Sequence, residues 1–79
     1  MKLIRYSEKR LTYGEVHKIG DTLIKCEPYY DIDSSWYRVA ENNEYALDYD
    51  RNTADQRIVN KKENTEVWSY YGDFYNGEN

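Results

Sequence analysis

The sequence predicts a small, mainly β domain, either an antiparallel sheet or a barrel-like arrangement, which becomes α+β if one short helix forms near residues 53–62. The chain has 79 residues, enough for one domain. Apolar and polar residues alternate in short segments separated by Gly, Asn and Asp, which is typical of half-buried strands joined by turns. Ten Tyr and two Trp add residue types that favour strands. We expect a single domain over residues 1–72 and a frayed acidic tail over residues 73–79.

The core is expected to be thin and rich in aromatic rings. Four Leu, five Ile, four Val and one Phe among 79 residues are few for a folded domain. The tyrosines and tryptophans compensate for this, because each ring can bury a large apolar area. Aromatic side chains are therefore expected both in the core and on the surface.

The first predicted elements form a short strand and a hairpin. Residues 2–6 alternate as a strand does, and residues 12–19 contain several residues that favour an extended chain. Gly20-Asp21 then offers a two-residue turn, because Gly tolerates the positive φ that hairpin turns require. Pairing across this turn with residues 22–26 places four side chains on one side, namely His17, Ile19, Ile24 and Cys26.

The second hairpin is the clearest pattern in the sequence. Residues 29–35, after Pro28, are expected to form a loop, because they contain the short polar side chains of Asp31, Asp33, Ser34 and Ser35. Residues 36–40 and 45–50 alternate on either side of Asn42-Asn43, and Asn adopts the left-handed conformation needed in such turns. Pairing outward from this turn sets Ala40 opposite Tyr45, Arg38 opposite Leu47 and Trp36 opposite Tyr49 on one face, and Val39 opposite Ala46 and Tyr37 opposite Asp48 on the other.

The segment from residue 50 to residue 62 fits two structures. Thr53 and Gln56 have the spacing of a capping box, which favours a helix. Alternatively, residues 57–60 form a strand that pairs with residues 65–71 across a turn at 61–64, with Ile58 opposite Val67. The β-branched residues favour the strand, and we weight the helix slightly more.

Composition excludes several kinds of site. A single Cys26 cannot form a disulfide within the chain or a zinc site built on paired thiolates, and His17 is the only imidazole. No nucleophile accompanies His17 convincingly, and residues 48–59 begin like a calcium loop but lack its Gly and closing Glu. We expect no enzymatic activity, no cofactor and no metal. The lone thiol and the absence of a long apolar segment indicate a cytoplasmic protein without a membrane segment.

Acidic residues are concentrated in the middle of the chain. The net charge is −4, yet residues 26–50 contain seven acidic residues and one basic residue. The alternative function is binding of single-stranded nucleic acid, because Tyr6, Tyr13, Trp36 and Tyr37, with Lys and Arg nearby, offer a platform on which bases can stack. The richest aromatic region, residues 29–49, is also the most acidic and would repel a phosphate backbone, so direct nucleic-acid binding is the less favoured interpretation.

A protein-binding surface fits these residues best. Tyrosine and tryptophan are common anchors in interfaces, and residues 68–75 supply a further mixture of this kind. Carboxylates among tyrosines complement a basic target, such as a nucleic-acid-binding protein. In composition alone, the chain resembles phage-encoded inhibitors of host nucleases or defence complexes. The sequence therefore predicts an acidic, non-enzymatic inhibitor of a basic protein that binds through Tyr29, Tyr30, Asp31, Asp33, Tyr37, Asp48 and Asp50.

Overall fold

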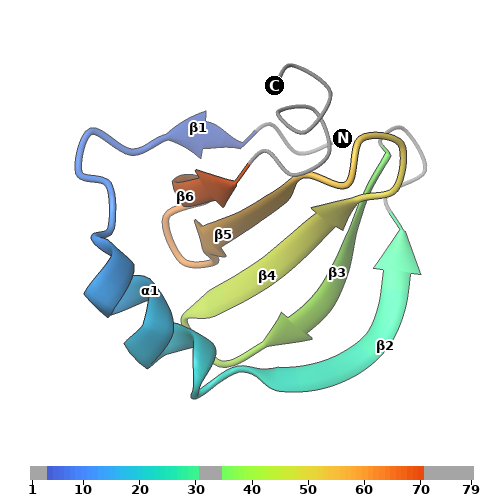
Figure 1. The fold of residues 1–79 in the computed structure, drawn as a ribbon, viewed down its shortest axis with the longest axis horizontal. Coiled ribbons are helices and arrows are strands. Elements are labelled where there is room, and N and C mark those ends of the chain that lie inside the picture. Colours follow the sequence, from blue (N-terminus) through green and yellow to red (C-terminus); the bar gives the residue numbers. More distant parts are fainter. Residues whose placement is uncertain (1–3, 31–34, 71–79) are drawn as a thin grey trace, which may run out of the picture.

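A computed structural model describes residues 4–30 and 35–70, with the side chains of residues 29 and 30 left out. Six strands form one sheet in the order β1-β6-β5-β4-β3-β2, and a single helix accompanies it, so the prediction of a mainly β fold is confirmed (Figure 1). The sheet is not closed into a barrel. The elements are β1 (Arg5–Tyr6), α1 (Tyr13–Gly20), β2 (Ile24–Tyr30), β3 (Trp36–Glu41), β4 (Tyr45–Asp50), β5 (Gln56–Asn60) and β6 (Thr65–Tyr70).

Neighbouring strands are antiparallel except at one edge. β2 to β6 pair in sequence order, whereas β1 returns to lie parallel to β6. The predicted strand at residues 2–6 is thus confirmed for Arg5 and Tyr6, its first two residues lying outside the described part of the chain. Within residues 4–30 and 35–70, no helix is both long enough and apolar enough to cross a membrane. The expected tail at 73–79 also lies outside the described residues.

The hairpin expected at residues 12–26 is wrong, because α1 occupies residues 13–20. Thr12 caps the helix: its hydroxyl accepts a hydrogen bond from the Glu15 N–H, and the Glu15 carboxylate accepts one from the Thr12 N–H at 2.9 Å. This reciprocal capping satisfies two helical N–H groups, and the spacing of Val16 and Ile19 gives the helix one apolar side. Figure 1 places α1 near the end of the sheet where the β3–β4 and β5–β6 turns lie, and the Asn42 amide donates to Thr22 Oγ1, just beyond the helix, at 2.8 Å.

The helix favoured at residues 53–62 is also wrong. The alternative strand is correct, but Ile58 pairs with Trp68 and not with Val67 as predicted. Ala54 has a φ of 64°, which no helix accommodates, so the chain turns there and enters β5. Ile58 and Val59 are 2% exposed in the middle of the sheet, between β4 and β6. Burial of these β-branched residues on both sides of a central strand outweighs the local capping signal.

The β3–β4 hairpin is confirmed, but its register differs from the predicted one. Asn42 acts as the first residue of the turn: its side-chain oxygen accepts hydrogen bonds from the N–H groups of Glu44 and Tyr45. The turn is therefore centred on residues 43–44, and Val39 is bulged out of the pairing. The observed pairs are Trp36 with Asp50, Tyr37 with Tyr49, Arg38 with Asp48, Ala40 with Leu47 and Glu41 with Ala46.

This shift separates the side chains of the sheet into two faces of different chemistry. Paired residues point to the same side, so Arg38 joins Asp48 and Tyr37 joins Tyr49. A second bulge lies at Val67 in β6. On either side of it, Glu66 pairs with Val59 on one face of the sheet, and Trp68 pairs with Ile58 on the other. The charged face comprises Trp36, Arg38, Glu41, Ala46, Asp48, Asp50, Arg57, Val59 and Glu66, and the aromatic face comprises Tyr37, Tyr45, Leu47, Tyr49, Ile58, Trp68 and Tyr70.

The buried interior is small and holds as many polar as apolar residues. Within the described residues, the buried apolar side chains are Ala46, Ile58, Val59 and Val67, and the buried polar or charged side chains are Asp48, Asp50, Thr65 and Glu66. Three of these four polar residues carry carboxylates, all of them on the charged face. The fold therefore depends on satisfying buried charges as well as on excluding water from apolar groups.

Candidate interaction surface

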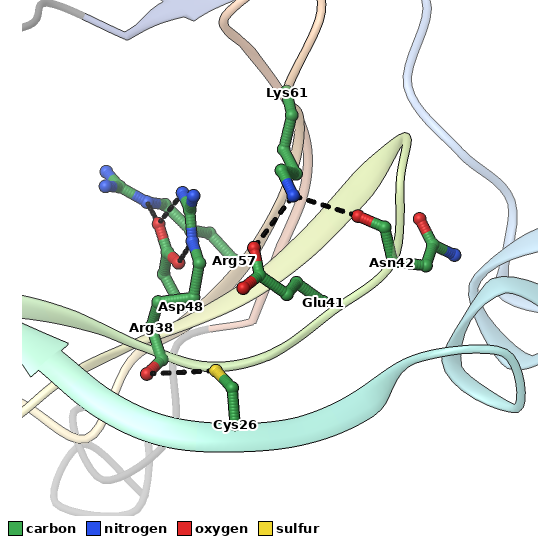
Figure 2. A network of polar contacts seen from close by, with 7 residues as sticks. All are labelled: Cys26, Arg38, Glu41, Asn42, Asp48, Arg57 and Lys61. Atoms are coloured by element: carbon green, nitrogen blue, oxygen red, sulfur yellow. Dashed lines mark hydrogen bonds and ion pairs between the residues drawn. The ribbon is translucent and has the colours of Figure 1, made fainter.

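Asp48 is at the centre of an ion network on the charged face (Figure 2). Its side chain is 5% exposed and binds two guanidinium groups, Arg38 Nε at 2.8 Å and Arg57 Nε at 3.2 Å. The three residues are paired across β3, β4 and β5, so the register itself brings them together. Arg57 also lies over the Trp36 ring, 4.1 Å from its centre, which adds a cation–π contact.

Two further ion pairs extend this network. Lys61 Nζ contacts Glu41 Oε1 at 2.8 Å and the Asn42 carbonyl at 2.9 Å (Figure 2). Arg10, from the segment between β1 and α1, contacts Glu66 Oε2 at 3.7 Å and donates to Ser69 Oγ at 3.0 Å. These side chains therefore form their ionic contacts on the charged face with other groups of the same molecule.

Glu66 is the least satisfied carboxylate of this face. It is 6% exposed, and its Oε2 atom has no hydrogen-bond partner, because 3.7 Å from Arg10 is too long for one. Burial raises the pKa of Glu66, and the positive charges of Arg10 and Arg57 only partly oppose this effect. Ionised Glu66 therefore weakens the fold near neutral pH.

Asp50 is buried as well, but it is fully engaged. It accepts hydrogen bonds from the Ser35 hydroxyl at 2.8 Å and from the backbone N–H groups of Asn52 and Thr53. Burial alone would raise the pKa of Asp50, but these hydrogen bonds outweigh burial and lower it. Its carboxylate thus holds the β4–β5 loop in place.

The aromatic face presents a row of side chains across the sheet. Tyr37, Tyr49, Gln56 and Tyr70 are paired in turn on β3, β4, β5 and β6. The rings of Tyr37 and Tyr49 meet edge to face with centres 5.6 Å apart, whereas Tyr70 stacks on Trp68 at 6.2 Å. Tyr70 is 50% exposed, and Tyr37, Tyr49 and Trp68 are half-buried. Such a row provides rigid rings that remain accessible to a partner.

Carboxylates surround the other end of the aromatic face. Tyr45, at the start of β4, lies near Glu44 in the β3–β4 turn, Glu63 in the β5–β6 turn and Glu15 in α1. Burial raises the pKa of Tyr45, and the negative charges of Glu44, Glu15 and Glu63 raise it further. All three carboxylate side chains are exposed. The aromatic face is therefore bordered by negative charge at the Tyr45 end.

The seven residues predicted to bind a partner do not share one surface. Tyr37 lies on the aromatic face, whereas Asp48 and Asp50 lie buried on the charged face. On β2, the backbones of Tyr29 and Tyr30 pair with those of Arg38 and Tyr37. Asp31 and Asp33 lie outside the described residues. The sequence interpretation assigned Tyr45 and Tyr49 to the same face as Trp36 and did not place them beside Tyr37. The alternation of β4 places Tyr45 and Tyr49 on one face, but only the correct register between β3 and β4 shows that Tyr37 shares this face.

The charge of the described surface is close to balanced, although the whole chain has a net charge of −4. Seven basic and six acidic side chains of the described residues are exposed. Most of the acidic excess of β3 and β4 is used inside the fold, by Glu41, Asp48 and Asp50. Comparisons with protein-family models, with curated proteins and with solved structures find no match to this chain.

Proposed function

We propose that this chain is a non-enzymatic protein-binding module and that the aromatic face is its contact surface. The observation that supports this proposal is the row formed by Tyr37, Tyr49 and Tyr70, which remains partly accessible on an open sheet. Rings in such a row offer large contact area with few torsions to immobilise, and their hydroxyl groups can still form hydrogen bonds. The charged face is a less suitable surface, because its ions already bind one another.

A narrower form of the proposal is the inhibition of a basic nucleic-acid-binding protein in the cytoplasm, as a phage-type inhibitor would act. Asp48 and Asp50 contribute little to such an interaction, because their carboxylates are bound inside the fold. The exposed carboxylates Glu44 and Glu63, at the border of the aromatic face, take over the electrostatic role. This places negative charge beside tyrosines, which would complement a basic partner.

Single-stranded nucleic acid is the second candidate ligand, because a row of rings on a sheet can also stack on bases. The carboxylates around Tyr45 and the near balance of exposed charge provide little attraction for a phosphate chain. We therefore favour a protein partner and include the nucleic acid as one arm of the test.

The test compares the wild-type chain with the double variant Tyr49→Ser, Tyr70→Ser. Tyr13→Ser is the matched control, because Tyr13 is 73% exposed on α1, away from the row. Each chain is immobilised, and proteins retained from a bacterial lysate are quantified by mass spectrometry after circular dichroism has shown that all three chains fold.

We expect at least one protein to be retained by the wild type and the control, and to fall about tenfold with the double variant, as loss of an anchoring ring predicts. Equal retention by all three chains would contradict the proposal. Binding of labelled single-stranded oligonucleotides by the wild type, lost in the same double variant, would favour the nucleic-acid alternative instead.

A further inference from the structure

We infer that the protein partner presents an arginine or lysine beside its apolar contact residues, and that this cation lies next to Tyr45, between Glu44 and Glu63. The inference rests on the proposed function, since it names the chemistry of the partner that the aromatic face would take. It goes beyond that function by assigning a position and a charge to one group of the partner.

The fold brings the two turns that carry these carboxylates side by side, although they are distant in the sequence. The Lys61 N–H donates to the Glu44 carbonyl at 2.8 Å, which fixes the β5–β6 turn against the β3–β4 turn. Tyr45 pairs directly with Asn60, the last residue of β5 before the turn that contains Glu63. The turn is further held by the Arg5 guanidinium, which donates to the Glu63 carbonyl at 2.7 Å and not to its carboxylate.

Within the described residues, neither carboxylate is neutralised by an ion pair. The salt bridges of this part of the chain engage Glu41, Asp48 and Glu66. Lys61, in the same turn as Glu63, contacts Glu41 and the Asn42 carbonyl instead, on the charged side of the sheet (Figure 2). Lys62 is exposed in the same turn and forms no salt bridge with the described residues. Two exposed negative charges thus remain at the border of the aromatic face.

The carboxylates around Tyr45 make this position attractive to a positive charge. The charges that raise the pKa of Tyr45 are all carboxylates, those of Glu44, Glu15 and Glu63. The Glu15 carboxylate is partly occupied by its capping bonds to Thr12, and the Glu44 carboxylate by a hydrogen bond with the Tyr45 side chain, so the Glu63 carboxylate and the remaining lone pairs of Glu44 have the greater capacity to bind a new cation. A guanidinium or ammonium group placed here would gain both carboxylate contacts and the face of a half-buried ring. A carboxylate of the partner would be repelled.

The inference is tested by selecting binders from a displayed library of random peptides. The library is applied to the wild-type chain, to the double variant Glu44→Gln, Glu63→Gln, and to the control variant Glu8→Gln, Glu27→Gln. Both double variants remove two exposed carboxylates, so they change the net charge equally. The variant Tyr49→Ser, Tyr70→Ser is included to test the aromatic face itself, and an unrelated β protein sets the background.

We expect peptides selected by the wild type and by the control to combine aromatic or aliphatic residues with Arg or Lys. The strongest peptide should bind the Glu44→Gln, Glu63→Gln chain about threefold to tenfold more weakly in fluorescence anisotropy, and this difference should shrink at high salt. Replacing its basic residue by Gln should weaken binding to the wild type by a similar factor.

The outcomes separate the inference from the proposed function. Selection of apolar peptides without basic residues, lost only with Tyr49→Ser, Tyr70→Ser, would overturn the inference and leave the proposed function supported. Equal weakening by both carboxylate variants would show a general effect of net charge and would also overturn the inference. Peptides that bind the tyrosine variant as well as the wild type, or no enrichment above background, would overturn both.

Discussion

Asp48 shows how a single residue can determine the chemistry of one face of the sheet. Its carboxylate is removed from water and is bound by Arg38 and Arg57. Burying an ion costs several kcal/mol, and the attraction of two guanidinium groups offsets this only when the geometry is good. Here the pairing of β3, β4 and β5 supplies that geometry, so the network depends on the correct register.

We predict that Asp48→Asn destabilises the protein by about 3 kcal/mol, near the lower end of the range for breaking a buried ion pair. Asparagine keeps the shape of the side chain but removes the negative charge that both guanidinium groups bind, and these are 19% and 15% exposed, so water relieves part of the cost. Urea unfolding measures the change, with Glu8→Gln as an exposed control. A loss below about 1 kcal/mol would show that the network contributes only as a surface pair does.

At the scale of elements, two similar motifs in the sequence led to opposite structures. Thr12-x-x-Glu15 caps α1, whereas Thr53-x-x-Gln56 leads into a strand, since Gln56 is the first residue of β5. The difference lies in the residues after the second motif, because Ile58 and Val59 become buried between β4 and β6. A capping motif can be recognised from neighbouring residues alone, whereas burial in a central strand depends on residues elsewhere in the chain.

Alternation predicted the strands β3, β4 and β6, but it did not predict the faces of the sheet to which their side chains point. Alternation within β4 correctly separated Tyr45, Leu47 and Tyr49 from Ala46 and Asp48. It could not show that Asn42 opens the turn or that Val39 is bulged. The bulge moves Trp36, Tyr37 and Arg38 to the face opposite to the predicted one, whereas Ala40 keeps its face and pairs with Leu47. For this reason Tyr37 and Asp48 were assigned to the same surface, although the structure places them on opposite faces.

Ala54 offers a test at the scale of a loop. It has a φ of 64°, in the left-handed region that is unfavourable for alanine, so we predict that Ala54→Gly stabilises the protein by about 0.5–1 kcal/mol. Asn64→Gly is the matched control, because Asn64 has a φ of 57° but asparagine tolerates this conformation. Thermal unfolding measures both, and Asn64→Gly should not raise the melting temperature as Ala54→Gly does. A lower melting temperature for Ala54→Gly would contradict the prediction that the positive φ of Ala54 destabilises the loop.

At the scale of the whole molecule, stability is set by carboxylates with opposite responses to pH. The pKa of Glu66 is raised above 4.5 mainly by burial, so its ionisation destabilises the fold, and this cost disappears as the pH falls towards 4.5. Hydrogen bonds outweigh burial and lower the pKa of Asp50 from 3.8, and bonding to Lys61 lowers that of Glu41 from 4.5. Their stabilisation is present at higher pH and is lost only as the pH falls through the lowered values.

We therefore predict that the free energy of unfolding increases as the pH falls from 7 towards about 5 and decreases at lower pH. Glu66→Gln should stabilise the protein at pH 7 and remove the increase between pH 7 and pH 5, while leaving the decrease at lower pH. Urea unfolding across this range measures the profile, and Glu63→Gln serves as an exposed control. A wild-type profile that only decreases from pH 7 downwards would contradict the role of Glu66.

The network of Arg38, Asp48 and Arg57 also bears on how this chain can evolve. Losing Asp48 leaves positive charge without its counterion on the buried side of the sheet, whereas three apolar residues of similar volume would pack there without such a charge. Substitutions at these positions should therefore survive as a set and seldom one at a time. The tyrosines of the opposite face take no part in this ion network, so substitutions there leave its charges balanced. Under the proposed function, the contact surface can therefore change while the charged face that supports the fold is kept.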